Sequence, residues 1–177
     1  HLENYINYFL SNNATLKGSL SVTTDFIDVN SFMAEASNST SEGGVVLLPN
    51  HIAFDLTADA KKVRFNDLEL YNLKGALQIA EQKLKVNQTT FDLIDTSFTL
   101  NATYEPISSR SALFDFDIQA QHFDIQKAYK ELTLFREMVS AAESASGQVS
   151  LNYQLTGRLN ADMYPVMPSL MGGGDLT

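Results

Sequence analysis

The chain has 177 residues, no cysteine, and 21 acidic against 12 basic side chains, for a formal net charge of −9. This acidic excess would repel a nucleic-acid backbone or an anionic membrane surface. The absence of cysteine excludes disulfides, thiolate metal sites and cysteine nucleophiles. The sequence also has no run of about eighteen apolar residues that would cross a bilayer, and no segment that resembles an export signal.

The N-terminal part of the chain mixes helical and extended patterns. We expect a helix over 2–10, a strand that ends before Asp28, and a short helix over 29–36 capped by Asp28. A polar, glycine-ended stretch at 37–44 is typical of a loop. We therefore divide the chain into 1–44, the end of a preceding repeat with its loop, and 45–177, a β-rich repeat segment. The two parts form one continuous domain that we expect to be truncated at both ends.

Alternation of apolar and polar residues dominates the stretch from 52 to 120 and returns at 149–155. A half-buried antiparallel strand requires this pattern, because successive side chains point to opposite faces of a sheet. The alternation changes phase several times, which indicates bulges or tight turns; Asn72, residues 81–83 and residues 94–96 are candidate turns. The fold class predicted is mainly β, a curved antiparallel meander that forms an open groove or partial barrel, with a few short flanking helices.

Two further helices are expected in the C-terminal half. Apolar residues spaced by three and four predict a helix from Asp124, its N-cap, to about Ala142. A second helix is expected over 164–171, where Pro165 would start it and the Gly172–Gly174 run would end it. A new strand would then begin near Asp175.

Short internal echoes indicate a protein built by repetition. Residues 20–30 align without a gap to 116–126, each a strand followed by Asp and the start of a helix. Residues 16–22 resemble 73–79, and 147–151 follow the same spacing. Units of this kind, about a hundred residues apart, are typical of repeat architectures.

The C-terminal run resembles the C-terminal region of AsmA-family proteins. The resemblance lies in a strand at 151–159 that contains Gly157, a short helix at 164–171 with Ser169 and Leu170 near its end, a glycine run, and a new strand. The ladder of strands from 68 to 104 and the unit 114–129 are similar to the same family. The likeness covers roughly residues 14–177, and it consists of strands and glycines without a catalytic signature.

The resemblance implies a segment of a bacterial envelope protein. AsmA-like proteins have an N-terminal membrane anchor and a periplasmic body, and they are related to TamB-like and bridge-like lipid transfer proteins with apolar β-grooves. The family is linked to outer-membrane assembly and phospholipid transport. The implied location is therefore the periplasm, in a parent protein anchored in the inner membrane. The implied partners are phospholipid acyl chains, neighbouring repeats of the same chain and other envelope proteins. We expect the anchor of the parent protein to lie outside these 177 residues.

Catalytic and metal-binding patterns are weak. His51 and His122 have no second ligand at metal-binding spacing, and no phosphate-binding loop or nucleophile elbow occurs. Carboxylate pairs occur at Asp92/Asp95 and Asp115/Asp117. The second pair alternates with Phe114 and Phe116, which favours a solvated outer face over a glycosidase site. We therefore expect no enzyme activity, no metal and no cofactor. A carbohydrate-active β-sandwich is the less favoured enzymatic alternative.

The apolar strand faces carry the functional hypothesis. Seven side chains are candidates to line a groove for acyl chains: Phe98, Leu100, Phe114, Phe116, Ile118, Leu151 and Tyr153. Each buried methylene would favour binding by roughly 0.8 kcal/mol, so a lipid would need no specific polar contact to stay bound. The alternative is a closed core that packs these faces together, in a structural or protein-interaction module. Alternation alone does not distinguish lipid from protein as the covering material.

Overall fold

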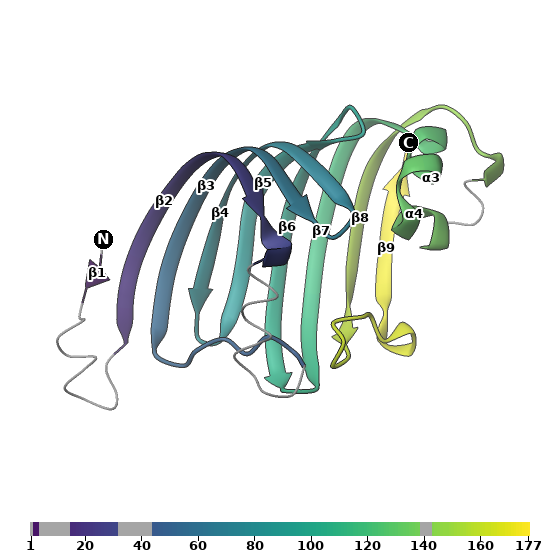
Figure 1. The fold of residues 1–177 in the computed structure, drawn as a ribbon. Helices are drawn as coiled ribbons and strands as arrows, with labels where there is room; N and C mark the ends of the chain where they lie inside the picture. Colours follow the sequence, from purple (N-terminus) through teal and green to yellow (C-terminus); the bar gives the residue numbers. More distant parts are fainter. Residues whose placement is uncertain (1, 4–14, 32–43, 139–142) are drawn as a thin grey trace.

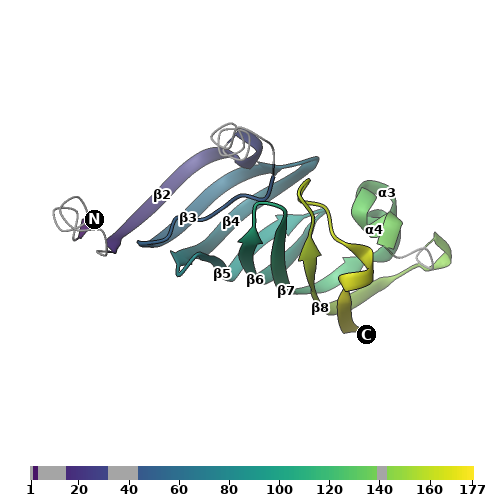
Figure 2. The ribbon, with the colours of Figure 1, turned by 90° about the horizontal axis from the view of Figure 1, so that it is seen from below.

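A single nine-stranded sheet dominates the computed structural model, which describes residues 2–3, 15–31, 44–138 and 143–177 (Figure 1). The strands follow one another across the sheet in chain order. Seen from below in Figure 2, β2 and β8 lie far apart, near the two ends of the sheet, and the sheet does not close. The mainly β, curved and open architecture predicted from the sequence is confirmed. The strands are β1 (Leu2–Glu3), β2 (Leu16–Asp28), β3 (Ile52–Phe65), β4 (Leu68–Ala80), β5 (Lys83–Leu93), β6 (Thr96–Ser108), β7 (Ser111–Asp124), β8 (Gln148–Leu159) and β9 (Met171–Leu176).

The pairing of β2 with β3 departs from the predicted meander. These two strands run parallel, from the Leu16–Ile52 pair to the Asp28–Arg64 pair, whereas every other neighbouring pair is antiparallel. Two parallel neighbouring strands cannot be joined by a tight hairpin, because the chain must first return along the sheet to the end at which the first strand began. The connection from 29 to 51 makes this return, and β2 thereby joins the same sheet as the strands that follow residue 45.

Tight turns and bulges occur where the alternation changes phase. Glu81 and Gln82 both have positive φ, as do Ile94 and Asp95, which is the backbone geometry of two-residue hairpin turns of type I′. These two predicted turns are confirmed. Asn72 also has positive φ, but it lies inside β4 at a register irregularity, so it forms a bulge and not a turn. Similar irregularities interrupt the β5–β6 and β7–β8 pairings, and such bulges bend a sheet.

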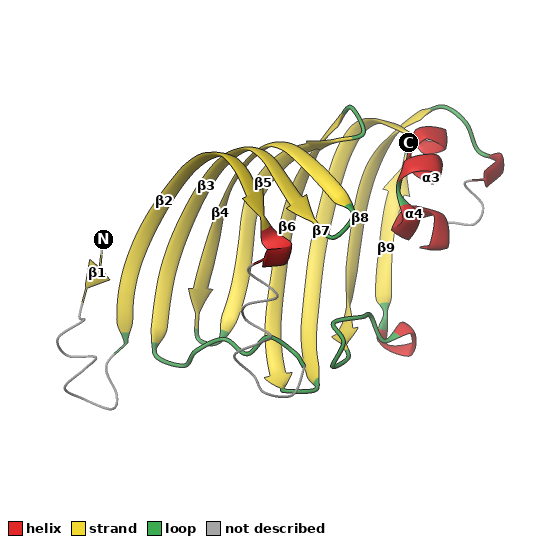
Figure 3. Ribbon diagram, viewed as in Figure 1, coloured by secondary structure: helices red, strands yellow, loops and turns green. Residues whose placement is uncertain are grey.

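Helices are few and lie mainly near one end of the sheet (Figure 3). The helix predicted from Asp124 is two short helices, α3 (Ile125–Glu131) and α4 (Thr133–Met138), with a break at Leu132. The Asp124 carboxylate accepts a hydrogen bond from the Lys127 amide at 2.9 Å, so the predicted cap is confirmed. Asp28 likewise accepts from the Asn30 amide at 3.1 Å, at the start of a helical turn over 29–31. No described helix is long and apolar enough to cross a membrane.

Two sequence-based helix predictions are wrong in the described residues. Within 164–171 only η2 (Met167–Ser169), a 3-10 turn, is helical, and Gly172–Gly174 lie within β9 instead of ending a helix. At the N-terminus, residues 2–3 form β1 against β2 and not the start of a helix. The remainder of that prediction, the 32–36 part of the helix after Asp28, the loop at 37–43 and residues 139–142 lie outside the described residues.

Candidate functional site

Apolar side chains form continuous rows across one face of the sheet, which we call the inner face. Residues that are paired across neighbouring strands point to the same face of the sheet, so the pairing register shows which side chains of successive strands lie side by side. One row runs without interruption from β2 to β9, and the next row runs from β2 to β8. The first consists of Leu20, Leu56, Leu77, Val86, Ala102, Phe116, Leu155 and Gly172, and the second of Gly18, Phe54, Ile79, Leu84, Tyr104, Phe114 and Gly157.

The opposite, outer face is polar and bears cross-strand ion pairs. Lys61 Nζ lies 2.7 Å from Asp25, and Lys83 Nζ lies 3.1 Å from Glu105. The Lys61 ammonium holds the pKa of the Asp25 carboxyl below its ordinary value. Exposed pairs of this kind stabilise a fold little, but they keep this face hydrated. The two faces of the sheet therefore differ sharply in chemistry.

The helices cover the inner face at the end of β5, β6 and β7. A buried cluster forms there from Phe91, Phe98, Ala120, Phe123 and Ala128, and Phe135 of α4 packs beside it. The Phe98 ring centroid lies 5.5 Å from that of Phe91 and 5.9 Å from that of Phe123. Of the predicted groove residues, Phe98 is therefore a core residue, with 3% of its surface exposed. Leu100, Ile118 and Leu151 pack against the margin of this cluster.

Residues 44–49, which precede β3, cover part of the inner face at the opposite end. The buried Val45 donates its amide hydrogen to the Ser109 carbonyl, with 3.0 Å between nitrogen and oxygen. The Tyr104 hydroxyl donates to the Val46 carbonyl at 2.9 Å and thereby holds the connection against the inner face. The alternation pattern contained no signal for this cover, because residues 44–49 form no regular element.

The burial of Tyr104 predicts that the folded chain loses stability at alkaline pH. Burial raises the pKa of Tyr104 from 10.0 to about 12, so between these pH values the folded chain keeps a proton that the unfolded chain has lost. The stabilisation is complete below pH 10 and is lost as the pH rises toward 12. We expect urea denaturation to show a steeper loss of stability over this interval in the native chain than in Tyr104→Phe. Parallel losses in the two proteins would contradict the assignment.

Between the two covers, the inner face stays partly open. Leu20 is 52% exposed, and Leu56, Leu77, Val86, Ala102 and Phe116 of the same row are each partly exposed. Phe114 and Phe116 stack with their ring centroids 6.2 Å apart, and Tyr153 lies one row away on β8. Of the predicted groove residues, Phe114, Phe116 and Tyr153 are the ones outside the helical cluster and its margin. The sequence-based set omitted the β2–β5 half of this surface, although the same alternation marks it.

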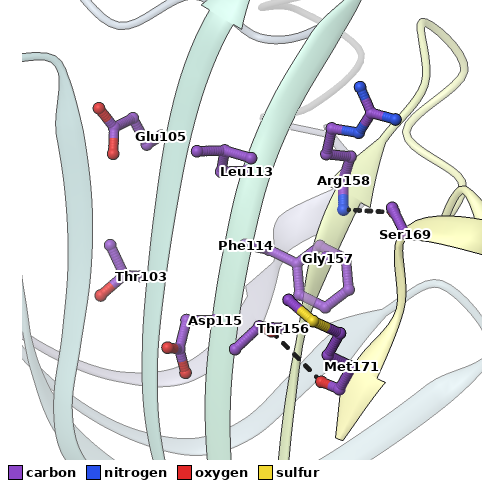
Figure 4. Close-up of a pocket in the computed structure, with 10 residues that line it drawn as sticks. All are labelled: Thr103, Glu105, Leu113, Phe114, Asp115, Thr156, Gly157, Arg158, Ser169 and Met171. Carbon is purple, nitrogen blue, oxygen red and sulfur yellow. Dashed lines mark hydrogen bonds between the residues drawn. The ribbon is translucent and has the colours of Figure 1, made fainter.

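The acidic and histidine side chains that were weighed as catalytic candidates have hydrogen-bond partners, an ion-pair partner or exposed positions. Asp115 lies on the outer face, as predicted, in an open recess of about 450 Å³ whose lining includes Leu113, Thr156 and Arg158 (Figure 4). Asp92 accepts hydrogen bonds from Asn72 at 2.7 Å and Ser97 at 2.5 Å, which lower its pKa.

The remaining candidate groups have structural roles or exposed positions. Asp95 pairs with Lys127 of α3. His51 and His122 are exposed and have positive φ, and no group of metal-ligating side chains occurs in the described part of the chain.

Comparison with protein-family models, with curated proteins and with solved structures found no match for this chain. The chemical difference between the two faces of the sheet is therefore the observation that bears on function.

Proposed function

We propose that this chain is a non-enzymatic, periplasmic segment of an AsmA-like envelope protein, and that its inner face shields phospholipid acyl chains during lipid transport or outer-membrane assembly. The observation that carries the proposal is the uninterrupted apolar row from Leu20 on β2 to Gly172 on β9. No residue performs chemistry in this mechanism.

The energetics of acyl-chain burial fit such a surface. Each methylene removed from water contributes roughly 0.8 kcal/mol, so a few methylenes on the open row exceed the gain from one good hydrogen bond. The row runs across the strands, so its apolar character continues for the width of the sheet. The polar outer face stays in water. Lipid head groups would lie at the open margins of the curved sheet, where they remain hydrated.

The covers over the two ends of the inner face favour a second candidate, a structural or protein-interaction β module. Phe98 and Val45 are already buried by the chain's own segments. In that case the covers would close the inner face, and its apolar rows would act only as a core.

Lipid binding can be tested by native mass spectrometry and organic extraction of the purified 177-residue chain. We expect co-purifying phospholipid, and a loss of most of it in Leu20→Asp, since that side chain lies on the open row and is 52% exposed. Because Leu20 is so exposed, the substitution should leave folding intact. The matched control is Leu113→Asp, the same apolar-to-acidic change at a 40% exposed position on the outer face.

The control should retain lipid. A chain free of lipid that also takes up no fluorescent phospholipid would refute the transport proposal and favour the structural module. Equal loss in the two variants would show that the bound lipid does not occupy the inner face.

A further inference from the structure

Residues 44–49, which we call the strap, lie on the inner side of the sheet without joining it as a strand. The strap begins near the β6–β7 turn, where the Val45 amide donates to the Ser109 carbonyl, and leads to the start of β3 (Figure 2). It contains four consecutive apolar residues at 45–48, followed by Pro49, which has no amide hydrogen to donate to a neighbouring strand. The strap is therefore an apolar segment that lies on an apolar face.

The described contacts that hold the strap in place are few. Its backbone takes part in two of the hydrogen bonds among the described residues, from Val45 to Ser109 at 3.0 Å and from the Tyr104 hydroxyl to the Val46 carbonyl at 2.9 Å. Val45 is 2% exposed, whereas Leu47 is 50% exposed and the other strap residues are at least partly exposed. The strap is thus fixed mainly by one buried side chain and these two hydrogen bonds.

Both hydrogen bonds can be replaced when the strap leaves the face. The Met163 sulfur lies 3.7 Å from the Tyr104 hydroxyl oxygen and can accept its hydrogen in place of Val46. Ser109 is exposed, so water can donate to its carbonyl in place of the Val45 amide. Neither group is then left without a partner, which is the usual obstacle to opening such a contact. The main cost of release is the exposure of one valine, and an acyl chain of several methylenes gains more burial than that.

We propose that the strap is an intramolecular occupant of the inner face, which an acyl chain displaces when it binds beside Tyr104. This inference rests on the proposed function, because it concerns the regulation of the same face. Strap and lipid compete for one apolar surface. The apparent dissociation constant for lipid therefore equals the intrinsic constant divided by the fraction of chains whose strap is released. Loosening the strap tightens lipid binding, whereas loosening a purely structural cover would only lower stability.

Two substitutions loosen the strap, and titration with a fluorescent short-chain phosphatidylcholine measures the effect. Tyr104→Phe removes the hydroxyl but keeps an apolar ring on the face. We expect the dissociation constant to fall about 5-fold, the equivalent of one lost hydrogen bond. Val45→Asp disfavours the return of the strap to the apolar face and leaves the sheet unchanged, so we expect a fall of about 10-fold or more. The probe has no net charge, so the added carboxylate does not repel it.

Matched controls make the same chemical changes without loosening the strap. Leu47→Asp places the carboxylate on the strap at a half-exposed position, and Tyr71→Phe removes a hydroxyl of β4 that donates to Glu69. Both should leave the dissociation constant within about 2-fold of the native value. In the native chain, saturating probe should also speed hydrogen exchange at the Val45 amide, because binding releases that amide from Ser109.

The outcomes separate this inference from the proposed function. Tighter binding in both strap variants supports the inference, and so does binding that appears only in them. Equal or weaker binding in Tyr104→Phe, with clear binding to the native chain, overturns the strap inference and leaves lipid binding intact. An unchanged exchange rate at Val45 in the lipid-saturated native chain does the same. No binding in the native chain or in either strap variant overturns both. Should Val45→Asp fail to fold, Tyr104→Phe and the exchange measurement decide.

Discussion

Replacing Phe123 with alanine is expected to destabilise the fold by about 4 kcal/mol, in line with the loss of a buried aromatic ring. Phe123 is 2% exposed, and its ring makes edge contacts to Phe98 at 5.9 Å and to Phe135 at 5.3 Å between centroids. It is therefore the link between the sheet and α4. Because small domains are stable by only about 5–15 kcal/mol, this single change should remove a large part of the total.

Chemical denaturation gives the stability difference, and hydrogen exchange should show lost protection in α4. The control is Phe26→Ala on β2, where the ring is 47% exposed and contacts Arg64. That change should cost less than about 1 kcal/mol. If the two variants were equally unstable, the helical cluster would not be the main core.

Gly75→Val should destabilise the chain by about 3 kcal/mol through overpacking. A Cβ added at Gly75 would lie 2.0 Å from the Thr89 hydroxyl oxygen and 2.6 Å from the Thr89 Cβ. Thr89 is buried on β5, so its side chain has little room to move away. The gain in β propensity on replacing glycine, about 1 kcal/mol at most, does not offset such a clash.

Two controls separate this clash from a general effect of valine. Gly173→Val should be close to neutral, because an added Cβ there meets nothing within 4 Å. Thr89→Gly should partly rescue Gly75→Val in urea denaturation, which would appear as a favourable coupling energy in a double-mutant cycle. Additive effects of the two substitutions would rule out the contact as the cause.

Local patterns predicted the strands, the two-residue turns and the helix caps, because each depends on neighbouring residues. The alternation around Phe114 and Phe116 indicates a half-buried strand wherever it pairs, and Asp124 caps a helix whatever surrounds it. The change of phase at Asn72 predicted an irregularity, but the type of irregularity depended on Asp92 of the next strand, whose carboxylate accepts a hydrogen bond from the Asn72 side chain.

Features that depend on distant residues could not be predicted in the same way. The Gly172–Gly174 run fits a helix stop or a strand equally well, and its strand conformation depends on β8. An added Cβ at Gly174 would lie 2.9 Å from the Tyr153 ring. The candidate site shows the same division. Alternation identified which side chains share the inner face, but it carried no information on the covers over Phe98 and Tyr104.

The parallel pairing of β2 has a consequence for the order in which the sheet assembles. From β3 to β7, each strand can join its predecessor through a short hairpin, so every new ladder closes only a small loop. β2 pairs with residues 36 positions further along the chain, and the whole connection from 29 to 51 must be closed before its first ladder bonds form. Non-local contacts of this kind form late in folding. We therefore expect β2 to dock after the β3–β7 meander has formed.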